Sequence, residues 1–311
     1  MSRCLICYKD DLPDGNYYHA ECSVKLFGTP EPPELPYSLS EMKELAKKIV
    51  RSQGIMTGVQ PKISLGLEKT KQKKGRLTLM MGEFILKPPS EYYEQMPETE
   101  DLTMHLAERC KLATVPHALI PLASGELAYI TRRIDRSGEQ KIHMEDFCQL
   151  SELLTEDKYK SSMERVGKLV GELSSFPGLN LYNLFELTLF NYITGNNDMH
   201  LKNFSLIDRD GVWQLSPAYD LLNVNLVNEK DNEESALTIS GKKRRLKKQD
   251  FVQLARSYQL TDVQIRNAFY DILGKEKLLL DFIDKSFLMD EFKVKYKEIL
   301  ENRCAVLKKD S

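Results

Sequence analysis

The sequence has no apolar run long enough to cross a bilayer, which argues against a membrane protein. Its start, Met1-Ser-Arg-Cys4, lacks the apolar segment of a secretory signal, so we expect a cytoplasmic chain without a membrane partner. Charge of one sign is also missing, because 44 Lys and Arg stand against 46 Asp and Glu, a net charge of -2. A general nucleic-acid binder carries a basic excess, so that class is disfavoured.

Cysteine is scarce, with six in 311 residues. In a cytoplasmic chain of this length, so few cysteines do not suggest a disulfide scaffold. Three of them, Cys110, Cys148 and Cys304, are scattered, and we expect them to be small core residues. The chain is 41% hydrophobic and 29% charged, which is typical of a globular protein. Its length allows one two-lobed domain or two ordinary domains.

The other three cysteines lie near the start, together with a histidine. Cys4 and Cys7 form one pair with two residues between them, and His19 and Cys22 form a second pair with the same spacing. A tetrahedral Zn²⁺ ion takes four nitrogen or sulfur ligands, and two such pairs supply them. The alternative is a chance group of cysteines beside a surface histidine. We favour a zinc-knuckle-like segment over residues 1–27, for which the metal would be the main source of folding energy.

A proline-rich stretch over residues 28–37 follows and is typical of an extended linker. After it, Ser38 and Glu41 have the spacing of a capping box and predict the start of a helix. Short apolar runs bounded by turn residues then predict strands, with one helix around 102–110 between them. The predicted strands are 63–67, 76–81, 82–87, 119–122 and 126–131.

From about residue 135, helical periodicity dominates the sequence. A polar, non-helical stretch over 195–240 interrupts it, with a hairpin-like segment at 206–215 and a strand-like one at 236–239. We therefore predict an α+β, two-lobed protein-kinase-like fold, with a sheet-rich N-lobe (38–134) and a helical C-lobe (135–311) after the zinc-knuckle-like segment and linker. The predicted C-lobe helices are 147–154, 163–176, 181–193, 251–258, 263–273 and 282–307.

The non-helical stretch contains the segment with the most candidate catalytic and metal-binding side chains, Gly195 to Asn203. Protein kinases place a catalytic Asp and a metal-binding Asn five positions apart, which is the spacing of Asp198 and Asn203. His200 lies where that loop often carries a lysine and could contact the γ-phosphate. The alternative is a polar surface loop in which Asp198 is a cap.

Two further residues lie at the ends of predicted strands. Asp220 follows the hairpin-like segment, where kinases place an Asp that binds Mg²⁺. Its simpler interpretation is a helix cap, and the Asp-Phe-Gly of ordinary protein kinases is missing. Lys87 ends an apolar strand, where a buried ammonium needs an anionic partner such as an ATP phosphate. A lysine that reaches solvent from an edge strand is the alternative.

The stretch from Thr57 to Lys62 precedes these residues. Gly58 permits a tight turn whose N–H groups can face a phosphate, and Lys62 adds charge, although neither common glycine-rich phosphate motif is matched. The order of these elements is the one that an ATP-binding, two-lobed kinase needs: a glycine-containing loop, a strand lysine, an Asp-x-x-x-x-Asn segment and a strand-end Asp.

Together these motifs resemble the HipA-like serine/threonine kinases, and the resemblance covers roughly residues 55–310. The chain is similar to the short, HipT-like form, which lacks the N-terminal subdomain of longer members, and the Cys/His segment stands in its place. The motifs that carry the resemblance are Gly58–Lys62, Phe84–Pro88, Arg132–Arg136, Gly195–Asn203 and Ser216–Leu221.

The resemblance implies a bacterial serine/threonine kinase fold that uses ATP and Mg²⁺. It implies that Asp198 is the catalytic base and that Asn203 and Asp220 bind Mg²⁺. Lys87 would hold the phosphates and His200 would contact the γ-phosphate. The remaining implied sites are the phosphate-contacting residues Gly58, Val59, Gln60, Pro61 and Lys62, the hinge residues Arg132 and Ile134 beside adenine, and a regulatory phosphosite at Thr57.

The resemblance also implies partners. They are a protein substrate of the translation machinery such as an aminoacyl-tRNA synthetase, an antitoxin through which DNA is contacted indirectly, and a small HipS-like protein. Two other interpretations stay open: a non-catalytic module that binds ATP or docks an antitoxin, and a lipid or small-molecule kinase with the same core.

Overall fold

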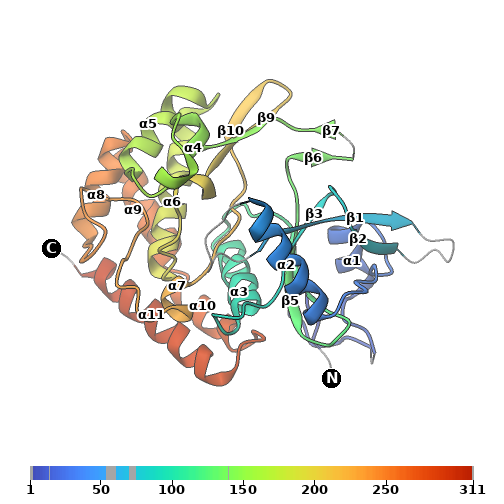
Figure 1. Cartoon of the computed structure of the whole chain (residues 1–311). Coiled ribbons are helices and arrows are strands. Elements are labelled where there is room, and N and C mark those ends of the chain that lie inside the picture. Colours follow the sequence, from blue (N-terminus) through green and yellow to red (C-terminus); the bar gives the residue numbers. More distant parts are fainter. Residues whose placement is uncertain (1–2, 14, 54–60, 70–74, 139, 310–311) are drawn as a thin grey trace. The chain divides into compact units, whose positions relative to one another are not determined.

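The computed structural model describes residues 3–13, 15–53, 61–69, 75–138 and 140–309. The chain divides into two compact units (Figure 1). The first unit comprises Met1–Asp101 and Val115–Gln140, and the second comprises Leu102–Thr114 and Lys141–Ser311. Helix α3 (Met96–Arg109) contributes residues to both. The domain boundaries predicted from the sequence, 1–27, 28–37, 38–134 and 135–311, stay predictions.

The first unit is built on an antiparallel sheet with the strand order β2-β1-β3-β5-β4. The predicted strands in this region are confirmed, with shifts of up to two residues at their ends. Helices α1 (Ala20–Phe27) and α2 (Leu39–Gln53) belong to the same unit. The strands are β1 (Ile63–Lys69), β2 (Gly75–Leu79), β3 (Phe84–Lys87), β4 (His117–Pro121) and β5 (Leu127–Arg132), and the short β6 (Arg136–Ser137) pairs with β7 (Gln140–Lys141).

Alternation along β3 decides which side chains face the core of the sheet. Successive side chains of a strand point to opposite faces, so Phe84 and Leu86 share one face and Lys87 belongs to the other. The register of β3 and β5 places Lys87 opposite Tyr129, and its ammonium lies 5.4 Å from the centre of that ring. Lys87 is therefore buried at the end of a strand instead of reaching solvent, as its 4% exposure shows.

The proline-rich stretch before α2 is attached to the sheet. The N–H of Glu34 donates to the carbonyl of Gly75, and the N–H of Leu77 donates to the carbonyl of Glu34, both at 2.9 Å. The capping box at the start of α2 is confirmed. Glu41 accepts a hydrogen bond from the N–H of Ser38 at 2.8 Å, and its own N–H donates to the Ser38 hydroxyl.

The second unit is mainly helical. Its central element is α6, which packs against α5, α9 and α11 and buries most of its length. Proline at the first position suits the start of α6, because its missing N–H would lack a helical partner there. The helices, besides the end of α3, are α4 (Phe147–Leu150), α5 (Met163–Leu173), α6 (Pro177–Ile193), α7 (Val224–Val227), α8 (Lys248–Ser257), α9 (Asp262–Leu273), α10 (Glu276–Ile283) and α11 (Asp290–Lys308), with 3-10 turns at Thr155–Asp157 and Leu201–Asn203.

A small sheet of order β10-β9-β8 completes this unit, from strands β8 (Met144–Asp146), β9 (Ser205–Arg209) and β10 (Val212–Leu215). The predicted hairpin is confirmed. Its turn residues Asp210 and Gly211 both have positive φ, 56° and 81°, as the two-residue turns that match strand twist require. The hairpin fixes where the chain arrives at Asp220.

Three sequence predictions in this unit are wrong. The helix predicted over 282–307 is two helices, because Ser286 bonds back to Ile283 through its N–H and its hydroxyl and ends α10. The helix predicted over 147–154 ends at Leu150. The strand predicted over 236–239 forms only isolated bridges at Thr238 and Ile239. In each case an apolar pattern continues through residues whose backbone is not regular.

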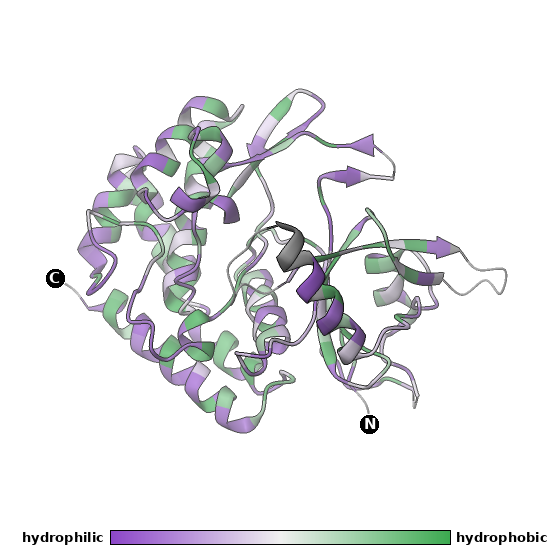
Figure 2. Cartoon of the chain, in the orientation of Figure 1, coloured by the Kyte–Doolittle hydropathy of each residue, from purple (hydrophilic) through white to green (hydrophobic). Residues whose placement is uncertain are grey.

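Polar and apolar residues alternate along the helices of the second unit (Figure 2). Within the part of the chain that the structure describes, none of the helices combines the length and the apolar character that a membrane span requires.

Candidate functional site

The segment that carries Asp198 begins directly after α6. Gly195 has a φ of +68°, which other residues rarely adopt. A Cβ at this position would also lie 2.6 Å from Oδ1 of Asn223, the atom that accepts the N–H of Leu226 and caps α7. Gly195 therefore permits both the sharp exit from α6 and the close approach of Asn223.

Asp198, His200 and Asn203 are held together through one carbonyl group. The backbone oxygen of Asp198 accepts the N–H of His200 at 2.8 Å and the side-chain Nδ2 of Asn203 at 3.0 Å. This places the three predicted site residues in one turn, with His200 and Asn203 buried and the Asp198 side chain half-buried. Since Asn203 uses its amide nitrogen, its Oδ1 is the atom that a cation could take.

Tyr159 covers the side chain of Asp198. Its phenolic hydroxyl donates to Oδ1 of Asp198 at 2.5 Å, and its ring meets that of His200 edge to face at 5.0 Å. Burial and the neighbouring Asp198 charge raise the pKa of Tyr159 well above its usual value, so the hydroxyl stays protonated. A hydroxyl group already lies where Asp198 would receive one from a substrate.

Asp220 follows β10 and is tied to the same region by its neighbour. The hydroxyl of Tyr219 is 2.5 Å from the Ser205 hydroxyl and donates to the carbonyl of Lys202 at 3.2 Å. Asp220 itself has a φ of +56°, a conformation that costs free energy in a residue with a Cβ. Strained backbone of this kind is concentrated at functional sites, which makes Asp220 a candidate functional residue.

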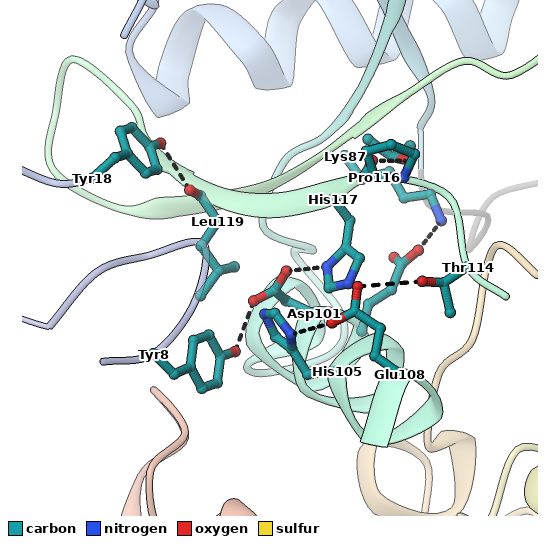
Figure 3. Close-up of polar contacts among 12 residues, drawn as sticks. Tyr8, Tyr18, Lys87, Asp101, His105, Glu108, Thr114, Pro116, His117 and Leu119 are labelled. Carbon is teal, nitrogen blue, oxygen red and sulfur yellow. Dashed lines mark hydrogen bonds and ion pairs between the residues drawn. The ribbon is translucent and has the colours of Figure 1, made fainter. Parts of the chain in front are cut away.

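In the first unit, Lys87 forms a buried ion pair with Glu100 of α3 (Figure 3). Lys87 Nζ lies 2.5 Å from Glu100 Oε1, and the two side chains are 5% and 2% exposed. Each charge supplies the partner that makes burial of the other tolerable. Protein kinases pair a strand lysine with a helix glutamate in this way to place the lysine for the phosphates of ATP.

Asp101, the residue after Glu100, is the centre of a second buried contact (Figure 3). Its Oδ2 accepts the hydroxyl of Tyr8 at 2.7 Å, and its Oδ1 accepts Nδ1–H of His117 at 2.7 Å. His117 must donate here, because an ionised carboxylate only accepts. This contact joins the start of the chain, α3 and β4.

The remaining predicted nucleotide-binding residues lie in or near the first sheet. Arg132 ends β5, lies 3.5 Å from Glu83 in an ion pair and is half-exposed, as is Ile134. Pro61 and Lys62 immediately precede β1, and the Lys62 side chain is exposed. Thr57, Gly58, Val59 and Gln60 lie outside the described residues.

The four predicted metal ligands at the start of the chain are gathered in one place. The ligand atoms of Cys4, Cys7, His19 and Cys22 all lie within 4.8 Å of one another. Nδ1 of His19 is 3.4 Å from the Cys7 sulfur and 3.8 Å from the Cys22 sulfur. Burial and the neighbouring Cys4 charge raise the pKa of Cys22 to about 12, so the group favours thiols unless a cation is bound.

Sequence reasoning missed Glu100, Tyr159 and the Tyr8–Asp101–His117 contact. A signal for Glu100 was present, since a strand lysine followed by a helix with acidic residues in its first turns suggests an ion pair. Tyr159 precedes Asp198 by 39 positions, and no spacing rule connects them.

Comparisons with known proteins identify the family and the fold. A family model described as HipA-like C-terminal domain matches residues 54–276. The Sinorhizobium fredii protein named "Putative kinase Y4dM" is 31% identical over 225 residues, which are 67% of this chain and 54% of the relative. The serine/threonine-protein kinase toxin HipA of Shewanella oneidensis is 25% identical over 197 residues, which are 56% of this chain and 44% of the toxin.

The structure of Shewanella oneidensis HipA, solved in a complex with HipB and operator DNA, has the same fold. It superposes with a TM-score of 0.69 at 19% identity and covers 96% of this chain and 82% of that one. The chain spans only about half the length of the curated relatives it matches. The predicted kinase-like α+β fold and the predicted resemblance are thereby confirmed. Since the matching model covers well over half of the sequence, this chain belongs to the family of HipA-like C-terminal domains.

Proposed function

We propose that this protein is an ATP-dependent serine/threonine protein kinase in which Asp198 is the catalytic base. Asp198 would orient the acceptor hydroxyl and take its proton as the bond to the γ-phosphorus forms. His200, which lies in the same turn, would contact the γ-phosphate. The names of two relatives, a kinase and a serine/threonine-protein kinase toxin, support the reaction class.

One observation carries the proposal: a single carbonyl, that of Asp198, accepts hydrogen bonds from both His200 and Asn203. The turn would therefore fix the proposed base, γ-phosphate contact and metal ligand relative to one another before any substrate binds. Positioning of this kind supplies most of the rate in phosphoryl transfer, which needs little covalent chemistry from the protein.

Asn203 and Asp220 are suited to Mg²⁺. The ion prefers oxygen ligands, and an amide oxygen and a carboxylate match the small number of protein ligands that it usually takes beside phosphates and water. The hydrogen bond from Asn203 Nδ2 leaves Oδ1 available, and Asp220 has the positive φ that is concentrated at functional sites. When bound, Mg²⁺ would neutralise charge on the phosphates. Asn203 and Asp220 would hold it, while Asp198 remains the base.

Lys87 would bind the phosphates of ATP and Glu100 would keep it in place. A lysine ammonium that is 5% exposed has little rotational freedom once paired at 2.5 Å, so its direction is set by α3. The remaining nucleotide contacts are proposed on the same basis. Pro61 and Lys62 would contact the phosphates, and Arg132 and Ile134 would lie at the hinge beside adenine.

The acceptor protein and the partners belong to the same proposal. The HipA of Shewanella oneidensis was solved with HipB and operator DNA. By analogy, we propose that this chain acts in a toxin–antitoxin system, binds an antitoxin and a small HipS-like protein, and phosphorylates a component of the translation machinery such as an aminoacyl-tRNA synthetase. Contact with DNA would occur only through the antitoxin.

The test is incubation of the purified chain with γ-labelled ATP, Mg²⁺ and a bacterial extract, followed by phosphopeptide mapping. We expect new phosphoserine or phosphothreonine in one or a few proteins, and loss of all of it with Asp198→Ala. Asp208→Ala, at a half-exposed position of β9, is the matched control and should retain the labelling.

The alternatives give different results in the same experiment. Label found only in the lipid or small-molecule fraction would indicate a lipid or metabolite kinase. Nucleotide binding without transfer to any acceptor would indicate a non-catalytic module.

A further inference from the structure

We propose that Cys4, Cys7, His19 and Cys22 bind one Zn²⁺ ion, and that the bound ion sets the position of α3 through the contact between Tyr8 and Asp101. The metal site stands on its own geometry. Its effect on phosphoryl transfer rests on the role proposed above for Lys87.

The distances between the ligand atoms match those of a tetrahedral zinc site. With Zn–S near 2.3 Å and Zn–N near 2.0 Å, tetrahedral angles put sulfur about 3.5 Å from nitrogen. The His19 nitrogen lies 3.4 Å and 3.8 Å from the Cys7 and Cys22 sulfurs. All six cysteines of the chain are free thiols, so the three at this site are not consumed by disulfides.

The donor set selects the metal. Three thiolates and one imidazole suit Zn²⁺, whereas Mg²⁺ and Ca²⁺ prefer oxygen. Four protein ligands close the coordination sphere, which is the arrangement of a structural rather than a catalytic zinc site. His19 also has the outer partner that zinc-bound histidines usually have, because its Nε2 lies 3.0 Å from Oδ1 of Asp11.

Backbone hydrogen bonds and turns bring the four proposed zinc ligands close to one another. The N–H of Tyr8 returns to the carbonyl of Cys4 at 3.0 Å, and Tyr8 has a φ of +62°, which closes a tight turn around the first pair. His19 is the N-cap of α1, so Cys22 lies in the first turn of that helix. Between the two pairs, the N–H of Leu5 donates to the carbonyl of Tyr17 at 3.0 Å.

The Cys/His segment is bonded to the sheet at β4. The hydroxyl of Tyr18 donates to the carbonyl of Leu119 at 2.9 Å (Figure 3), and the N–H of Leu119 donates to the carbonyl of Leu5. Phe27 at the end of α1 packs against Phe84 of β3, with ring centres 5.7 Å apart. The proposed metal site is therefore a structural part of the first unit.

Tyr8 connects this segment to α3. The residue directly follows Cys7 and is 2% exposed, and its hydroxyl meets a carboxylate that is itself fully buried. Asp101 and Glu100 are consecutive on α3, so they leave the helix about 100° apart. Asp101 holds the helix to Tyr8 and His117, and Glu100 holds Lys87. Loss of the metal frees the turn that carries Tyr8, and the loosened helix then moves Glu100 away from Lys87.

Zinc content is the first measurement. The purified full-length chain should contain one zinc per chain by mass spectrometry, and Cys22→Ser should contain almost none. Cys148→Ser, which can still donate to the carbonyls that Cys148 contacts, is the matched control and should keep the ion. A wild-type chain without zinc, and unable to bind added Zn²⁺, overturns the site.

A variant at an exposed residue gives a second test, which does not depend on the folding of the cysteine variants. Asp11 is largely exposed and has a φ of +107°, which glycine adopts without strain. Asp11→Gly should therefore fold normally and lose zinc to a chelator roughly ten- to a hundredfold more readily. An unchanged rate of zinc loss would contradict the assignment of His19 as a ligand.

Tyr8→Phe tests the connection to α3, because it keeps every metal ligand. We expect it to retain zinc, to speed amide hydrogen exchange over the first turns of α3 by roughly tenfold and to slow phosphoryl transfer. Removal of zinc from the wild type should give the same change in exchange. Unchanged exchange in both cases overturns the coupling. Absence of transfer in the wild type counts only against the proposed function, since zinc content and exchange are measured without ATP.

Discussion

The hydroxyl of Tyr159 donates to the carboxylate of Asp198 at 2.5 Å, and the ring of Tyr159 lies edge-on against His200. In the proposed mechanism, an acceptor serine or threonine would make this same hydrogen bond to Asp198. Both residues belong to the second unit, so this contact holds independently of the first.

Tyr159→Phe should raise the rate of phosphoryl transfer at low acceptor concentration by a few fold, because the acceptor no longer competes for Asp198. The phenyl ring still packs against His200, so the turn should keep its shape. Initial rates with an acceptor protein found by the labelling experiment proposed above are the measurement. A strongly reduced maximal rate would instead mean that Tyr159 positions Asp198 for catalysis.

Loss of Glu100 should destabilise the first unit more than loss of the whole ion pair. Glu100→Leu leaves the ammonium of Lys87 buried beside an apolar side chain, and breaking a buried pair from one side typically costs about 3–5 kcal/mol. In the double variant Lys87→Met, Glu100→Leu, we expect most of this stability to return while transfer stays abolished. Denaturant unfolding and labelled-ATP assays on the wild type and these two variants separate the two effects. Equal destabilisation by the single and double variants would contradict the argument.

Gly195→Ala should lower the free energy of unfolding by about 2–3 kcal/mol, since a left-handed alanine costs ~1–2 kcal/mol and the displaced Asn223 cap about 1 kcal/mol more. Gly178→Ala in α6 is the control, because a Cβ there would meet none of the described atoms within 4 Å. Alanine in a helix is favourable, so the control should be neutral or slightly stabilising. Thermal unfolding of both variants checks the difference.

Stability should fall between about pH 5 and pH 8 because of Glu98 and Glu186. Burial, together with the charge of Asp101 for Glu98 and of Asp271 for Glu186, raises the pKa of each carboxyl from 4.5 to about 7. A raised folded-state pKa favours the protonated folded form, so the contribution is complete below pH 4.5 and is lost as the pH passes 7. For Glu98, which is mostly buried, the loss is at most ~3 kcal/mol.

Glu98→Gln and Glu186→Gln should each flatten this pH profile, which chemical unfolding at several pH values would measure. A profile that falls equally steeply in both variants would assign the dependence to other groups.

Thr57 should carry phosphate after incubation of the purified chain with ATP, as its position ahead of the glycine-containing loop suggests. Peptide mass spectrometry on wild type and Asp198→Ala is the measurement, and the second protein should lack the modification. An unmodified Thr57 in chain that has phosphorylated its substrate would remove the proposed regulatory site.

Much of the first unit could be predicted because its signals are local. The strands around Phe84 and Tyr129 follow from apolar runs bounded by turn residues, and the Ser38–Glu41 capping box involves residues three positions apart. The spacing of Cys4, Cys7, His19 and Cys22 likewise predicted a cluster that the structure brings together. In the second unit, the five-position spacing of Asp198 and Asn203 corresponds to a direct hydrogen bond between them.

What the sequence by itself determined were therefore the short-range patterns: the order of most strands and helices, the spacing of the Cys/His cluster and the turn that carries Asp198 and Asn203. Only the tertiary structure decided that Glu100 pairs with Lys87, that Tyr8 meets Asp101 93 positions away and that Tyr159 covers Asp198. The first two contacts join buried polar groups, and the third joins an exposed tyrosine to a half-buried carboxylate. All three depend on how separate elements pack, and the two buried ones depend also on exclusion of water. Neither condition leaves a periodic trace along the chain.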